Sequence, residues 1–288
     1  MKSTKSYGLP IVGIVDVGAD VYMLQRENDK ISIFDPVDFN FKRHLTVAGI
    51  VDARSLVACQ RDHCLYIADA RPQRIRRVNL STGKVSQWYV DDEPTGLSVT
   101  RKYNLLVTLC QSNKIQEYTA EGHWIREIKL DVSMDRPQHS VEMPSGRPLI
   151  VVSHAGTVKH RVCVVDNDGA IVYSCGGNVG LSIGQFNHPG HLDVDSQGNV
   201  LVSDCKNDRV LLLSATLTYL GCVSTPGYSL RHPYALHLDQ LNGRLYVGEW
   251  AGGLIVLEAP NQSRCPAVAQ RPVLLSQPVD SAVPGIAQ

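Results

Sequence analysis

Four histidines recur beside prolines along this chain of 288 residues, and their side chains could do chemistry together. His188 and His232 directly precede a proline, whereas His139 and His191 follow one by two positions. Imidazole is a frequent zinc ligand, and histidines that converge could hold a catalytic zinc ion. Whether the four rings can meet depends on the elements that carry them.

An acidic and a basic residue recur five positions apart around a short turn. Asp69 and Arg74 show this spacing, and Asp204 and Arg209 repeat it. Residues at the two ends of a tight turn between antiparallel strands can face each other as an ion pair. We therefore predict that these two pairs are structural.

The stretch from 186 to 213, FNHPGHLDVDSQGNVLVSDCKNDRVLLL, contains three short apolar runs separated by turn-forming residues. Its β-branched content and turn spacing favour an antiparallel meander over a helix. The pattern returns at spacings of 40 to 51 residues, which are typical of propeller blades. In the six copies, the middle of the second strand falls at Tyr22, Tyr66, Leu106, Ile150, Leu201 and Tyr246.

We therefore predict an all-β fold, a six-bladed β-propeller with four-stranded antiparallel blades. Closing the ring buries both faces of every sheet. The predicted repeats cover residues 10–50, 53–92, 93–135, 136–187, 188–231 and 232–276. They form one domain over residues 1–277, and residues 278–288 are expected to be a loose tail.

The fifth repeat resembles an NHL repeat, through PGHLDVD at 189–195, GNVLV at 198–202 and the segment from Asp204 to Arg209. The resemblance extends from about residue 10 to 259, although Ser153 stands where the family has an aspartate. NHL repeats form six-bladed propellers at the C-terminus of tripartite-motif and related proteins, where they bind proteins or single-stranded RNA. The resemblance implies this fold and a recognition role. The chain has no RING-like Cys/His spacing, so no ubiquitin-ligase module is expected in it.

Six-bladed relatives include a peptide-amidating lyase, whose zinc-binding histidines directly follow the proline on three blades. In this chain the corresponding positions hold Thr95, Gln138, Gly190 and Tyr234. Successive side chains of a strand point to opposite faces, so a histidine displaced by one position is misdirected for such a site. We therefore predict no catalytic metal and no cofactor.

The carboxylates of the chain give little support for a calcium site or a catalytic site. Asp166, Asp168 and Asp195 lie at strand ends and in turns, where turn formation explains them better than calcium binding. Glu142 and Asp193 are the acids expected near the channel mouth, fewer than a lactonase-like site needs. The chain also lacks GxSxG, HExxH and phosphate-loop patterns.

Cations gather in the second-to-third-strand turns of three consecutive repeats, which predicts a basic arc around one mouth of the channel. Its members are Arg71, Arg74, Lys114, Lys159, His160 and Arg161. Such an arc suits an acidic peptide segment or a phosphate backbone. It offers no aromatic platform for stacking RNA bases. Trp250, beside small residues in a turn of the sixth repeat, is a candidate contact anchor.

These features favour a non-enzymatic recognition scaffold that binds a protein partner, with an acidic segment preferred, through the loop face. Single-stranded RNA binding on that face and a propeller hydrolase or lyase are the alternatives. Net charge is zero, and no apolar run approaches the roughly 20 residues that span a bilayer. We expect a cytoplasmic protein without membrane contact, monomeric as an isolated domain, in which Cys59 and Cys64 are free thiols.

Overall fold

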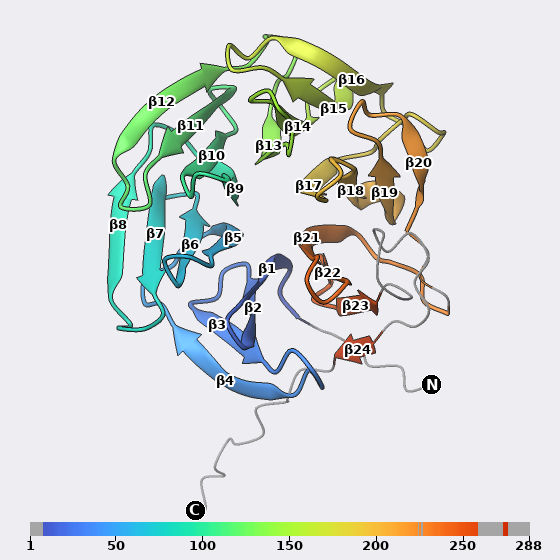
Figure 1. Cartoon of the computed structure of the whole chain (residues 1–288). Coiled ribbons are helices and arrows are strands. Elements are labelled where there is room, and N and C mark those ends of the chain that lie inside the picture. Colours follow the sequence, from blue (N-terminus) through green and yellow to red (C-terminus); the bar gives the residue numbers. More distant parts are fainter. Residues whose placement is uncertain (1–7, 224, 226, 259–272, 276–288) are drawn as a thin grey trace, which may run out of the picture.

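Six four-stranded antiparallel sheets surround a central channel, as Figure 1 shows, so the predicted six-bladed propeller is confirmed. The structure is a computed structural model that describes residues 8–223, 225, 227–258 and 273–275. Each sheet consists of four strands that are consecutive in the chain. The predicted loose tail lies outside the described residues.

In every blade the four strands follow one another from the channel to the rim and run in alternating directions (Figure 1). The innermost strands are β1 (Ile11–Val17), β5 (Ala53–Cys59), β9 (Pro94–Val99), β13 (Pro137–Glu142), β17 (Pro189–Val194) and β21 (Pro233–Asp239). The second strands are β2 (Asp20–Gln25), β6 (Cys64–Asp69), β10 (Leu105–Leu109), β14 (Ile150–Ala155), β18 (Val200–Asp204) and β22 (Arg244–Glu249). The third strands are β3 (Lys30–Phe34), β7 (Arg74–Asn79), β11 (Lys114–Tyr118), β15 (Lys159–Val165), β19 (Arg209–Leu213) and β23 (Leu254–Glu258). The outer strands are β4 (Phe41–Thr46), β8 (Val85–Tyr89), β12 (Trp124–Lys129), β16 (Ile171–Asn178), β20 (Tyr219–Cys222) and β24 (Val273–Leu275).

Burial of the second strands explains the apolar runs in the sequence. Every residue of β6, β10, β14 and β18 is buried, because neighbouring sheets cover both of their faces. Strands covered on both faces are continuously apolar instead of alternating. The outer strand β8 is largely exposed, as expected at the rim.

The two ends of the channel carry different turns. All inner strands begin at one end, here called the start face, which also carries the turns from second to third strands. They finish at the opposite end, here called the end face, which carries the turns from first to second strands. The only helix among the described residues is the three-residue 3₁₀ turn η1 (Cys205–Asn207), so none of these residues form a helix able to span a bilayer.

The Asp204–Arg209 pair holds the connection between the fourth and fifth blades. Arg209 Nε donates to Asp204 at 2.8 Å, and its guanidinium also donates to the carbonyl oxygens of Leu181 and Gln185 at 2.8 and 2.9 Å. The Asp204 side chain is fully buried and accepts the backbone N–H of Asn187 at 2.6 Å. One ion pair therefore ties both sides of the loop that leads into β17.

Asp69 and Arg74 form the same arrangement in the second blade. Their side chains are 2.9 Å apart, and Asp69 is fully buried. Asp69 Oδ1 accepts the backbone N–H groups of Val51 and Asp52 at 3.0 and 2.8 Å. Arg74 donates to the Gly49 carbonyl at 2.6 Å. The acid thus fixes the point at which the inner strand β5 begins.

Among the strands that the structure describes, the first and last blades meet without exchanging a strand. Gly248 allows this close approach, because a Cβ atom there would lie 2.5 Å from Ile11 Cγ2. At the end face, His237 Nε2 bonds Asp16, and its Nδ1 lies 3.9 Å from Asp193. Burial opposes protonation of His237, but the Asp16 hydrogen bond and the charge of Asp193 outweigh it and raise the pKa of His237.

We predict that replacing Arg209 with alanine lowers the free energy of unfolding by about 2 kcal/mol, because the buried Asp204 carboxylate loses its cation and two carbonyl oxygens lose donors. Arg43→Ala is the control, since Arg43 pairs with Asp20 at the surface and its side chain is 60% exposed. That change should cost less than about 0.5 kcal/mol. Urea denaturation measures both, and equal losses would contradict a structural role specific to Arg209.

We also predict that the seam between the first and last blades is stronger in mild acid than in base. The raised pKa of His237 adds stability that is fully present below about 6.5 and is lost as the pH rises through the raised value. Burial alone would raise the pKa of Asp16, but the hydrogen bond and charge of His237 lower it. The stability that ionised Asp16 adds to the seam is therefore lost only at more acidic pH. The His237→Gln variant should therefore be destabilised more at about pH 5.5 than at about pH 8.5 in urea denaturation. A pH-independent difference would contradict this account.

Candidate functional site in the central channel

His139 uses both ring nitrogens to join three inner strands. Its Nε2 donates to the Leu97 carbonyl of β9 at 2.9 Å, and its Nδ1 accepts the Leu192 N–H of β17 at 3.3 Å. Burial lowers the pKa of His139 to about 4. The ring is therefore neutral, and it has no free nitrogen for a ligand.

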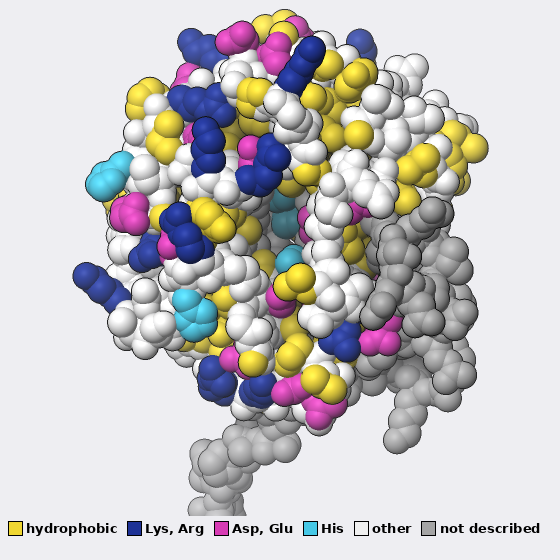
Figure 2. All heavy atoms as spheres, in the orientation of Figure 1, with side chains coloured by type: hydrophobic (Ala, Val, Ile, Leu, Met, Phe, Trp, Pro, Cys, Tyr) yellow, Lys and Arg dark blue, Asp and Glu magenta, His cyan; other side chains and the backbone are white. Residues whose placement is uncertain are grey.

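His191 occupies the same strand position in the next blade but is bound differently. Its ring stacks on His139 with 4.3 Å between centroids and lies 5.5 Å from the ring of Tyr234. The residue is only 5% exposed, yet its Nε2 has no hydrogen-bond partner among the described residues. Burial, with a smaller effect of His139, lowers the pKa of His191 well below that of a free histidine. A neutral imidazole on the inner strand β17 is thus left with a buried nitrogen that has no partner among the described residues. Figure 2, which looks along the channel, shows histidine side chains within it.

An aromatic and cationic series leads from His191 to the start face. The Tyr234 ring lies 5.3 Å from Trp250, and the Arg26 guanidinium lies 5.6 Å from the Trp250 ring. Tyr234 is buried, which raises its phenol pKa, whereas Trp250 is 38% exposed. A ligand entering from the start face would meet a flat apolar surface before it reached the imidazole.

Arginines surround the buried carboxylate of Asp52 beside this series. Arg26 Nε donates to Asp52 Oδ1 at 3.0 Å, and Arg54 donates to both carboxylate oxygens at 3.1 and 2.9 Å. Arg71 lies 3.6 Å away and is mostly exposed. Burial alone would raise the pKa of Asp52, but the hydrogen bonds and charges of Arg54 and Arg26 lower it. The cluster carries three guanidinium groups and one carboxylate, so it has positive charge available for an anionic or polarised oxygen.

Two thiols near the same mouth are poorly suited to act as nucleophiles. Burial, with a smaller effect of nearby acids, raises the pKa of Cys110 to about 11, and burial raises that of Cys205 to about 12. Both stay protonated at neutral pH, whereas the thiolate is the reactive form. Cys59 and Cys64 lie opposite each other in the register of β5 and β6, and both are free thiols.

The predicted basic arc is largely engaged within the chain. Lys114 is held between Asp91 and Glu127 at 2.9 and 2.8 Å. Arg161 donates to His154 Nε2 at 3.0 Å and to the Ser133 carbonyl at 2.8 Å. The cations are thus not a continuous free surface, and their role in partner binding stays a prediction.

The remaining members of the arc differ in exposure. Lys159 is exposed, whereas His160 is buried and accepts the backbone N–H of His188 at 3.0 Å. Arg74 is held by Asp69, and Arg71 lies at the edge of the Asp52 cluster.

The four histidines considered for zinc do not converge. His139 and His191 stack in the channel, His188 lies against His160, and His232 is an exposed residue 4.0 Å from Asp208. Within the described part of the chain, no group of three or more His, Cys, Asp or Glu side chains could hold a metal ion. These four histidines therefore form no common cluster in the described part of the chain.

The cluster of arginines around Asp52 is not predicted from the sequence. Arg26, Asp52 and Arg54 come from a turn of one blade and an inner strand of the next, so no local spacing relates Arg26 to the other two. A usable signal did exist, because aligning the repeats places Asp52 and Arg54 on either side of the inner-strand start.

Comparisons with known proteins identify the architecture but no family. No family model matches the chain, and no curated protein matches it, so the NHL assignment rests on the sequence resemblance alone. Among solved structures, the chain is similar to a streptogramin B lyase, with 14% identity, a TM-score of 0.63, and coverage of 89% of this chain and 81% of that one.

Two further structures are similar to the chain. One is a catalytically inactive histidine-to-alanine variant of virginiamycin B lyase from Staphylococcus aureus with quinupristin, with 15% identity, a TM-score of 0.62, and coverage of 91% and 85%. The other is a protein of unknown function from Bacteroides caccae, with 14% identity, a TM-score of 0.67, and coverage of 88% and 92%. At these identities the likeness establishes the propeller fold.

These neighbours correct the functional interpretation drawn from the sequence. The chain was interpreted as a non-enzymatic scaffold that binds a protein or RNA through its loop face, with an enzyme as the remote alternative. The solved structures that it resembles include lyases, so the propeller itself gives no reason to exclude an enzyme. The physical reason for the error is that several of the supposed binding cations have intramolecular partners, so they offer less free charge than their sequence positions suggest.

We predict that Asp52→Asn lowers the free energy of unfolding by about 2 kcal/mol, because three guanidinium groups lose their shared counter-charge. Asp91→Asn is the matched control, since the Asp91 side chain is 62% exposed and should matter by less than about 0.5 kcal/mol. Thermal and urea unfolding would test both variants. A stable Asp52→Asn protein would show that the arginines do not depend on this acid.

Proposed function

We propose that this chain is a lyase-type enzyme whose active site lies in the channel at the start face. The observation that carries the proposal is His191, a buried neutral imidazole whose Nε2 has no partner among the described residues. Buried polar atoms usually have a hydrogen-bond partner, so one without a partner calls for an explanation such as a catalytic role. Of the buried side-chain atoms that lack a partner among the described residues, His191 Nε2 is the imidazole nitrogen carried by an inner strand. The lyases among the structural neighbours support the choice of reaction class.

An elimination next to a carbonyl group needs three things from the protein. A base removes a proton, a positive group stabilises the enolate oxygen, and an acid protonates the leaving group. We assign the first role to His191, which is unprotonated at neutral pH, and the second to Arg54 at the edge of the channel. Tyr234, whose burial keeps its phenol protonated, is the candidate acid beside His191.

We predict that the purified protein converts quinupristin or another ester-containing substrate by elimination, and that His191→Ala lowers the rate at least about 100-fold. Mass spectrometry distinguishes this reaction from hydrolysis, which adds the mass of one water. The acid limb of the pH–rate profile should lie well below about 6.5, because burial lowers the pKa of His191.

His44→Ala is the control, because His44 is exposed on the outer strand β4 and lies away from the channel. It should leave the rate unchanged, while Tyr234→Phe should lower it. Water incorporation into the product would contradict the lyase assignment. Full activity in a folded His191→Ala variant, or no conversion across a panel of ester substrates, would contradict the proposed site.

A further inference from the structure

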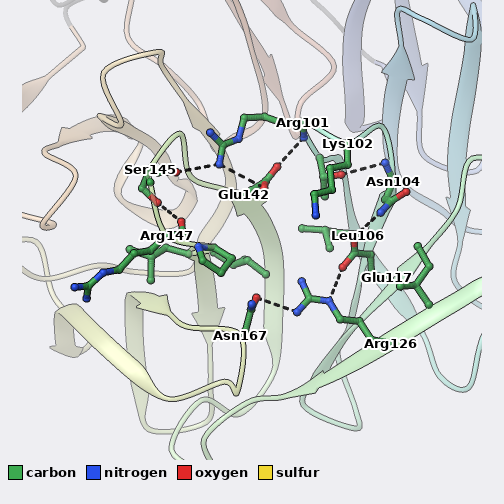
Figure 3. Close-up of a pocket in the computed structure, with 16 residues that line it drawn as sticks. Arg101, Lys102, Asn104, Leu106, Glu117, Arg126, Glu142, Ser145, Arg147 and Asn167 are labelled. Carbon is green, nitrogen blue, oxygen red and sulfur yellow. Dashed lines mark hydrogen bonds and ion pairs between the residues drawn. The ribbon is translucent and has the colours of Figure 1, made fainter.

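A second recess lies on the end face, away from the start-face mouth of the channel. It is a pocket of about 430 Å³ between the third and fourth blades (Figure 3). Its walls come from the β9–β10 turn, the β13–β14 turn and the strand β12. The volume lies within the range of small-molecule sites. The pocket shares no lining residue with the proposed active site.

Both carboxylates in this pocket are already neutralised by an arginine. Arg126 Nε donates to Glu117 at 2.6 Å, and its Nη1 donates to Asn167 Oδ1 at 2.9 Å. Glu142 accepts the backbone N–H of Arg101 at 2.6 Å, and the Arg101 guanidinium lies 3.6 Å from it. These two pairs leave no acidic group of the pocket to balance a further cation.

Lys102 is that further cation. Its ammonium group has no hydrogen bond or ion pair with any residue that the structure describes, and Figure 3 shows the side chain pointing into the pocket, whereas Arg147 points away from it. The Arg126 guanidinium faces the same interior (Figure 3). Figure 2 shows Lys and Arg side chains gathered on this face over the sector of β9 to β16. The pocket therefore has a net positive interior.

Apolar side chains complete the lining. Leu106 and Ile150 are buried, and Ile125 and Leu149 border the same space. Cationic groups beside an apolar wall recognise a molecule that has both an anionic end and a hydrocarbon or aromatic part. A fully hydrated inorganic ion would leave that wall exposed to water.

We propose that this pocket binds a small organic anion, with its charged group at Lys102 and Arg126 and its apolar part against Leu106 and Ile125. This binding site is separate from the proposed active site, and its ligand does not depend on the proposed lyase reaction. Because both cations can donate hydrogen bonds to carboxylate or phosphate oxygens, the shared chemistry is a single anionic group attached to an apolar body.

Isothermal titration calorimetry with phenyl phosphate, benzoate and inorganic phosphate tests this site. We expect phenyl phosphate or benzoate to bind more tightly than inorganic phosphate, and added salt to weaken the binding. Lys102→Glu should raise the dissociation constant at least about tenfold. Comparison of the two aromatic probes shows which anionic group is preferred.

Lys84→Glu is the matched control, because Lys84 is exposed in the β7–β8 turn of another blade and the variant makes the same change of charge. Its affinity for the probe should equal that of the unchanged protein. Equal weakening by Lys84→Glu and Lys102→Glu, inorganic phosphate binding as tightly as the aromatic probes, or no binding of either aromatic probe would overturn the proposal. The Lys102→Glu variant should convert quinupristin at the same rate as the unchanged protein. This readout distinguishes a failure of the anion site from a failure of the proposed lyase.

Discussion

The channel mouth depends on a buried carboxylate at the end of a second strand. Asp69 accepts the N–H groups of Val51 and Asp52, and this bond sets where β5 begins. It thereby places the Asp52 side chain where Arg26 of the first blade and Arg54 of the second can share it. Removing water from a carboxylate is costly unless donors replace it, and here backbone amides and guanidinium groups both do so. The Asp69–Arg74 ion pair and the Asp52 cluster therefore belong to one hydrogen-bond network, joined by the bond from the Asp52 N–H to Asp69.

The sequence is informative where the partners lie at the two ends of a single tight turn. The Asp-to-Arg spacing anticipated contacts that close across a single turn, and the repeat period anticipated six blades. It is uninformative where the partner lies on a more distant strand or on another blade. His237 and Asp16 are 221 positions apart, and Lys114 finds Asp91 and Glu127 on the connection and outer strand around it. Counting charges within one turn made Lys114 a free cation, because the acids of adjacent segments were left out of the count.

The two ends of the channel have opposite polarity. Arginines outnumber the single carboxylate in the cluster at the start face, whereas Asp16 and Asp193 flank His237 at the end face. The neutral rings of His139 and His191 lie between these ends in a region where burial disfavours charge. Within the channel itself, the arginine cluster can stabilise an anionic group at the start face, whereas the acids around His237 disfavour one at the end face, so a polar substrate would enter the channel in a preferred direction.

The contrast between His139 and His191 shows how a repeat separates structure from function. Both residues hold the same position in their inner strands, but the preceding blade presents a different neighbour to each. His139 faces Gly96, where an added Cβ would lie 2.7 Å from the imidazole Cδ2, and the absence of a side chain lets the ring reach the Leu97 carbonyl. His191 faces His139 itself, so its ring stacks instead of reaching a backbone oxygen. The His139 ring uses both nitrogens to join strands, and because it fills that space, the His191 ring keeps a nitrogen without a partner among the described residues. The candidate base therefore arises from the order of blades, a property that a single repeat cannot contain.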